Sequence, residues 1–247
     1  MDLWFGDSWT IGEELKKAPD PYDRSVFPNV SDKIENPFKA FSTYVSTQRN
    51  KEYINFAKSA SSIDFALYNL LKISANNTAE DFRTIKEKIK EDAGPHTAFL
   101  CLTAQVRGFG IDYPIIKHRH YHTSIRKSVH STEIYDSLVA INCFYSVCKN
   151  SNIDCVIIPI FTDLVIPKEF EHIVLFESSI LSKTSLVELT FGEKLIDDTL
   201  YNKAGTTETE IYEHLQQKDW IRPNNCHPNM IGHKKLAYKL VELLQNR

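Results

Sequence analysis

The sequence predicts a three-layer α/β/α sandwich around a mostly parallel central sheet of about five strands. Two observations support this prediction: short, nearly continuous apolar runs recur along the chain, and amphipathic helical stretches separate them. Strands that are apolar on both faces are typical of a parallel sheet covered by helices on each side. A chain of 247 residues is long enough to form one such domain without a metal or a disulfide.

Each strand candidate is a short apolar run bounded by turn or breaker residues. The first run stops at Gly6, and the Gly94-Pro95 break precedes the third. The fourth begins after Asp154. The candidate strands are residues 1–5, 53–57, 97–102, 155–160 and 173–176.

Each helix candidate has apolar residues at helical spacing. Asn77-Thr78 resembles a helix cap before one of them. The aromatic residues Phe38, Phe41 and Tyr44 also share this spacing, and we expect them in the core rather than in a sugar-binding platform. The candidate helices are residues 62–73, 79–91, 131–149 and 230–245.

Three stretches fit the pattern poorly and are interpreted as irregular insertions in a single domain spanning residues 1–247. Long irregular connections in a compact domain are usually functional loops or lids. We therefore expect them to set substrate specificity. The insertions are near residues 13–37, 105–130 and 178–223.

Composition excludes several classes of protein. The 29 basic and 32 acidic residues give a net charge of −3, which disfavours a dedicated nucleic-acid binder. No apolar run reaches the roughly 18–20 residues that a membrane span requires. Residues 1–5 run at once into polar Asp7 and Ser8, which predicts no signal peptide. Five cysteines without a CxxC pair indicate reduced thiols and a cytoplasmic location.

The first candidate catalytic motif is Gly6-Asp7-Ser8, directly after the first predicted strand. The carboxyl ends of the strands in such sheets are where ligands bind, so the Ser8 hydroxyl would face a crevice. Gly, Asp and Ser are also ordinary turn residues, and the motif alone fits a simple strand-ending turn equally well.

The second candidate motif runs from Asn225 to His233 and leads into the last predicted helix. A nucleophilic serine needs a base within hydrogen-bond reach, and His227 on the loop before this helix could supply it. A lone histidine here would more often be structural. Its pairing with a Gly-Asp-Ser turn at the other end of the chain favours a Ser8–His227 pair.

On these two motifs, the sequence resembles the SGNH (GDSL-type) hydrolase family. The resemblance spans the whole chain, and the forms GDSW-T-x-G and HPN-x-x-GH look most like divergent bacteriophage members. It implies the flavodoxin-like SGNH hydrolase fold and a serine esterase with no metal and no organic cofactor. The host cytoplasm or the virion would then be its location.

The resemblance also assigns the oxyanion hole. Asn55 to Ala60 matches the frame of the family's second block, with Ala60 in place of the usual glycine. The backbone N–H groups of Ser8 and Ala60 would be two donors, and Gln105 would replace the asparagine amide of the third block. Arg107 is a second candidate to meet negative charge.

Asn224 departs from the family pattern, which has an aspartate three residues before the histidine. An asparagine can hold the imidazole ring of His227 but cannot stabilise its charged form. A backbone carbonyl or Asp219 could orient the ring instead. This departure leaves open an alternative, a catalytically degenerate binding or structural protein of a phage.

Two further features have alternative interpretations. His118, His120 and His122 could form a metal site if extended, but a basic loop that attracts an anionic substrate is favoured. A third hypothesis makes residues 117–127 a nucleic-acid or anionic-polymer binder. Trp9 either walls the substrate pocket or packs beneath the turn. The expected partner is a small-molecule or carbohydrate ester, such as an O-acetyl group, and not a membrane.

Overall fold

The computed structural model describes residues 1–6, 10, 40–57, 63–74, 87, 89, 91–92, 94–102, 131–193, 217–221 and 227–247. Its strands form one sheet in the order β2-β1-β3-β4, and every adjacent pair is parallel. They are β1 (Asp2–Phe5), β2 (Tyr53–Asn55), β3 (Thr97–Leu102) and β4 (Asp154–Pro159). The predicted α/β class is confirmed, with four strands in the described residues instead of about five.

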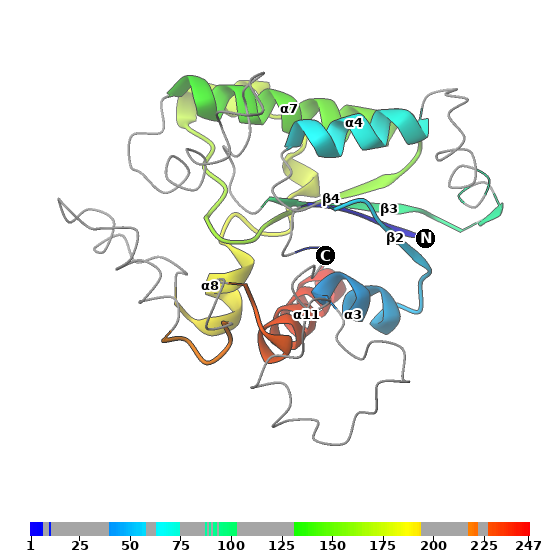
Figure 1. Cartoon of the computed structure of the whole chain (residues 1–247). Coiled ribbons are helices and arrows are strands. Elements are labelled where there is room, and N and C mark those ends of the chain that lie inside the picture. The colour runs from blue at the N-terminus through cyan, green and yellow to red at the C-terminus, as the bar shows by residue number, and fades with distance from the viewer. Residues whose placement is uncertain are drawn as a thin grey trace, which may run out of the picture.

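Helices cover both faces of this sheet (Figure 1). On one face lie α4 (Ile63–Ser74) and α7 (Ser131–Asn150), which pack against each other. The other face carries α3 (Phe41–Gln48), α8 (Leu186–Phe191) and α11 (Met230–Gln245), with α11 contacting both α3 and α8. The arrangement is the predicted three-layer sandwich.

Alternate side chains of β1 enter two separate cores. Leu3 and Phe5 belong to the core beneath α4 and α7. Trp4 lies in the core beneath α3 and α11, where it stacks on Phe99 with 4.1 Å between ring centroids. Because both faces are buried, the strand reads as a continuous apolar run instead of an alternating one.

The predicted strand over residues 173–176 is wrong. Its first residue ends the 3₁₀ helix η3 (Lys168–Ile173), and the next three have no regular structure. Asn142 of α7 donates to the Ile173 carbonyl at 2.8 Å and accepts from the Leu175 N–H at 2.9 Å. This side-chain amide occupies the backbone groups that a neighbouring strand would need.

Beyond β4, an isolated β-bridge extends the sheet in place of the predicted strand. A single parallel bridge joins Ile157 to Ile180, just after the short 3₁₀ helix η4 (Glu177–Ser179). The insertion predicted over 178–223 also contains α8, whose N-cap Ser185 accepts from the Glu188 N–H.

Several predicted segments lie wholly or mostly outside the described residues. Of the helix predicted over 79–91, the structure describes residues 87, 89 and 91, each in helical conformation. The insertions near 13–37 and 105–130 lie outside the described residues.

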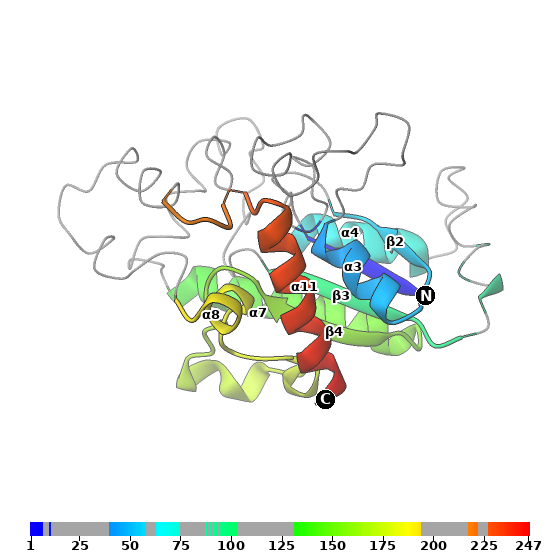
Figure 2. The same ribbon diagram turned by 90° about the horizontal axis from the view of Figure 1, so that it is seen from below.

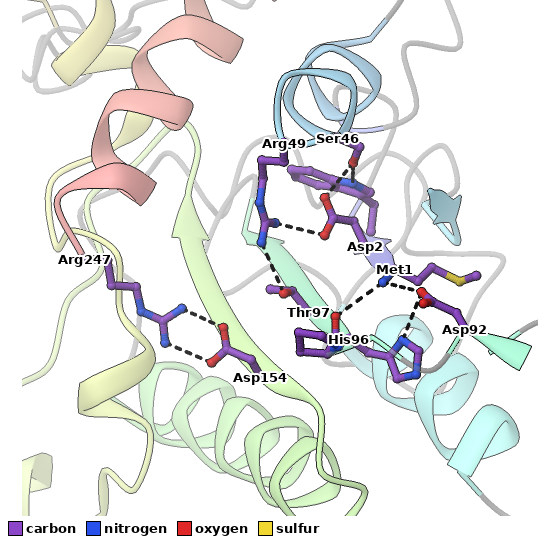
Figure 3. Close-up of polar contacts among 11 residues, drawn as sticks. Met1, Asp2, Ser46, Arg49, Asp92, His96, Thr97, Asp154 and Arg247 are labelled. Carbon is purple, nitrogen blue, oxygen red and sulfur yellow. Dashed lines mark hydrogen bonds and ion pairs between the residues drawn. The ribbon is translucent and has the colours of Figure 1, made fainter. Parts of the chain in front are cut away.

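A buried polar cluster ties α3 to the amino edge of the sheet (Figure 3). The Asp2 carboxylate accepts from Ser46 Oγ at 2.9 Å and pairs with Arg49 at 3.0 Å. Ser46 in turn accepts from Trp4 Nε1 at 2.9 Å. Burial raises the pKa of Asp2, while the adjacent Arg49 guanidinium and the Ser46 hydrogen bond act in the opposite direction.

Replacing Arg49 with methionine should lower the free energy of unfolding by about 3 kcal/mol at pH 7, because it leaves a buried carboxylate without its cation. The pKa of Asp2 then rises further. A carboxyl group with a raised pKa in the folded state gains stability as pH falls through that pKa. The deficit of Arg49→Met should therefore shrink as pH is lowered toward the ordinary aspartate value, which urea unfolding at several pH values would measure.

Arg247→Met is the matched control, because Arg247 pairs with the exposed carboxylate of Asp154 at 3.1 Å (Figure 3). Exposed ion pairs contribute about 0–1 kcal/mol. An equal loss of stability in the two variants would contradict the role given to the buried pair.

Candidate functional site

The sheet topology selects one edge for ligand binding. β2 lies on one side of β1, whereas β3 and β4 lie on the other, so the strand order changes direction between β1 and β3. In open α/β sheets, ligands bind outside the carboxyl ends of the strands at this point. Ser8 follows the carboxyl end of β1 and Gln105 follows that of β3 in the sequence.

Gly6 lies in a tightly packed position at this edge. A Cβ atom on Gly6 would clash with the Thr10 side chain and would lie 3.0 Å from Cys101 Cβ on β3. Among the described glycines, only Gly192 has a positive φ, so Gly6 is required for space and not for a left-handed backbone. The close approach lets the Thr10 side chain, which is fully buried, fold back over the end of β1.

The Thr10 carbonyl is held by two side chains from different elements. Ser42 Oγ, in the first turn of α3, donates to it at 2.7 Å. Asn55 Nδ2, at the end of β2, donates to it at 3.2 Å. Ser8 stands two residues before Thr10 in the sequence, so a described residue close after the candidate nucleophile is bonded to both α3 and β2.

His227 is half-buried and stands just before α11. The start of that helix is anchored by its N-cap Asn229, whose Oδ1 accepts from the Gly232 N–H at 3.0 Å. Asn229 also donates from Nδ2 to the Asp219 carbonyl at 2.7 Å and from its backbone N–H to the Trp220 carbonyl at 2.9 Å. These bonds fix the chain two residues after His227.

Two other residues of the HPN-x-x-GH block have structural roles. A Cβ atom on Gly232 would come within 2.5 Å of the Trp220 carbonyl oxygen, so only glycine fits there. His233 is buried, and its Nδ1 accepts from the Phe41 N–H at 3.2 Å. An accepting Nδ1 places the ring proton on Nε2. His233 thereby satisfies one of the free N–H groups at the start of α3.

The first turn of α3 therefore contacts both candidate motifs. Phe41 binds α11 through His233, and the next residue, Ser42, binds the segment that follows Ser8. Figure 2 shows α3 lying beside α11, and the two helices pack directly. Two segments more than 200 residues apart in sequence are brought to one edge of the fold by adjacent residues of one helix.

A cavity of about 450 Å³ opens beside the segment 217–221. Asp219, the alternative orienter of His227, has an exposed side chain on the cavity wall. Phe191 and Trp220 stack there with 3.9 Å between ring centroids. The cavity is lined by Phe191, Glu193, Gln217, Lys218, Asp219, Trp220 and Lys235.

Most of the predicted site residues lie outside the described residues. These residues are Ser8, Trp9, Ala60, Gln105, Arg107 and Asn224, together with the basic segment 117–127. Among the described residues there is no group of three or more candidate metal ligands. No helix in the described part of the chain is long and apolar enough to cross a bilayer.

The residues that join the motifs are not predicted by any local sequence pattern. Gly232 and His233 enter the sequence-based prediction only as parts of the closing motif, and no pattern marks Ser42. Asn55 was recognised only as part of a block, although an asparagine that accepts an N–H two residues later is a common turn signal. Here Asn55 Oδ1 accepts from the Ala57 N–H at 3.0 Å.

Two solved structures are similar to this chain, and both are assigned to the lipolytic G-D-S-L family. One, from Desulfitobacterium hafniense, is 11% identical, with a TM-score of 0.43 and 98% of each chain covered. The other, from Veillonella parvula, is 14% identical, with a TM-score of 0.39 and coverage of 100% of this chain and 98% of its own. No protein-family model and no curated protein matches the chain. The phage-like aspect of the resemblance stays a prediction.

Gly6→Ala should lower the free energy of unfolding by about 1–3 kcal/mol, because the added methyl group overlaps the Thr10 side chain. Thr10→Ala removes the overlapping hydroxyl, so it should restore part of the stability in the Gly6→Ala background. Urea unfolding of both single variants and the double variant measures this coupling. Strict additivity of the two effects would contradict the packing described for Gly6.

Proposed function

We propose that the chain is a serine hydrolase of carboxylic esters, with Ser8 as nucleophile and His227 as general base. The supporting observation is the double contact of α3, which binds the segment after Ser8 through Ser42 and the helix after His227 through Phe41. These contacts lie at the edge where the sheet order changes direction, the usual ligand site of such folds.

In the proposed reaction, His227 accepts the Ser8 hydroxyl proton while the Ser8 oxygen attacks the acyl carbon of the ester. The tetrahedral intermediate collapses, and the same proton passes to the departing alcohol. Water then attacks the acyl-enzyme by the reverse sequence of proton transfers, and the carboxylic acid is released. No cofactor is needed for any of these steps.

The negative charge on the tetrahedral intermediate is proposed to be bound by backbone N–H groups of Ser8 and Ala60 and by the Gln105 amide. Hydrogen-bond donors placed in advance around a developing oxyanion are usually the largest single contribution to such catalysis. Trp9 and Arg107 are proposed to contact the substrate. The substrate is a small-molecule or carbohydrate ester, such as an O-acetyl group.

The wild-type protein should react covalently with a fluorophosphonate probe at Ser8, because the probe detects a serine oxygen activated by a nearby base. Ser8→Ala should abolish labelling and the hydrolysis of p-nitrophenyl acetate. His227→Ala should lower both by several orders of magnitude, as loss of a triad member does in serine proteases. Peptide mapping of the adduct identifies the modified residue.

His233→Gln is the control for His227→Ala, since it alters the other histidine of the same block, which binds the Phe41 N–H and takes no part in proton transfer. It should reduce stability and slow labelling without abolishing the Ser8 adduct. A folded wild-type protein that forms no adduct at Ser8 would contradict the proposed hydrolase.

Asn224→Asp should raise the hydrolysis rate at least about tenfold, because a carboxylate stabilises the imidazolium that forms on His227 and an amide does not. Initial rates with p-nitrophenyl acetate measure the effect. The alternative, a degenerate binding or structural protein of a phage, predicts no hydrolysis in either form.

A further inference from the structure

We propose that Asn55 is a positioning residue for the Ser8 site. It binds Thr10 after Ser8, Ala57 before Ala60, and Ser42 on α3, and so holds them in one arrangement. The proposal rests on the proposed function. Asn55 ends β2 at the carboxyl edge of the sheet and is half-buried. It does not contact the substrate in this proposal, and it acts through the segments that it binds.

Three hydrogen bonds place the Asn55 amide between these segments. Nδ2 donates to the Thr10 carbonyl and to Ser42 Oγ, both at 3.2 Å. Oδ1 accepts from the Ala57 N–H at 3.0 Å. Thr10 follows Ser8, Ala57 lies in the block that ends at Ala60, and Ser42 belongs to the helix turn that binds α11.

The bonds around Asn55 are chemically complementary. Nδ2 faces two acceptors that lie only 2.7 Å apart, so one N–H of the amide points between the Thr10 carbonyl and Ser42 Oγ and is shared by both. The Ser42 hydroxyl donates its own hydrogen to the Thr10 carbonyl. The Thr10 carbonyl uses both lone pairs. A carboxylate of the same shape could accept from Ala57 but could not donate to Thr10, so only an amide fits all three bonds.

This arrangement explains how the oxyanion donor and the nucleophile can keep a fixed relation. Ser8 follows β1 and Ala60 follows β2 in the sequence, and nucleophilic catalysis requires their relative placement to within about an ångström. A single side chain that binds both Thr10 and Ala57 next to the strand ends can meet that requirement. The loss of its N–H donor should therefore affect the chemical step more than the binding of substrate.

Asn55→Asp tests the proposal, because it preserves the shape of the side chain and the bond from the Ala57 N–H while removing the amide N–H that the Thr10 carbonyl and Ser42 share. The variant should lower kcat for p-nitrophenyl acetate by about ten- to a hundredfold with little change in KM. The rate of fluorophosphonate labelling at Ser8 should fall in parallel. The matched control on the same strand is Tyr53→Phe. It removes the hydrogen bond between Tyr53 on β2 and Thr43 on α3, which lies away from the carboxyl ends of the strands.

A second pair of variants separates positioning from stability. Ser42 and Ser46 lie one turn apart on α3, and both are fully buried. Each hydroxyl donates one hydrogen bond and accepts another, Ser42 at the carboxyl edge and Ser46 at the amino edge. Ser42→Ala and Ser46→Ala should both lower the melting temperature, but only Ser42→Ala should lower kcat and the labelling rate.

The outcomes distinguish this proposal from the proposed function. If the wild-type protein is labelled at Ser8 and Asn55→Asp retains its full labelling rate and kcat, the positioning role is overturned and the hydrolase stands. Equal losses of kcat in Ser42→Ala and Ser46→Ala would also overturn it, because stability alone would then explain them. A folded wild-type protein without labelling at Ser8 overturns both proposals.

Discussion

The candidate site depends on the first turn of α3. The N-cap residue of this helix is Ala40, whose side chain cannot accept a hydrogen bond from the free N–H groups of the first turn. One of its free N–H groups, that of Phe41, is satisfied by His233, and the neighbouring Ser42 hydroxyl binds the Thr10 carbonyl. The first bond holds α11 at the start of α3, and the second holds the chain after β1 beside it, so two hydrogen bonds from adjacent residues bring these segments together.

The same helix divides its polar contacts between the two edges of the sheet. Ser46 joins the Asp2 and Arg49 cluster at the amino edge, while Ser42 joins Thr10 and Asn55 at the carboxyl edge. The two serines are four residues apart and so share a helix face. The amino-edge cluster fixes α3 against the sheet, and that fixed placement allows its other end to orient loops.

The sequence predicted the elements whose evidence is local. β3 and α11 were predicted over the residues they occupy, because a continuous apolar run marks one and apolar residues at helical spacing mark the other. The strand predicted over 173–176 failed because Asn142, some 30 residues away, binds its backbone. The α3 contacts likewise join residues far apart in sequence, so motif order could pair Ser8 with His227 but could not show what connects them.

The two motifs contain residues that the fold requires and residues that only the proposed chemistry requires. Packing accounts for Gly6 and Gly232, which leave no room for a Cβ atom, and hydrogen bonding accounts for Asn229 and His233. A degenerate relative that kept the fold would need these residues as much as an enzyme does. They therefore explain the resemblance to a hydrolase family without demanding hydrolysis. Ser8 and His227 are the positions that the proposed ester hydrolysis requires, so substitutions at those two side chains distinguish an enzyme from a degenerate relative.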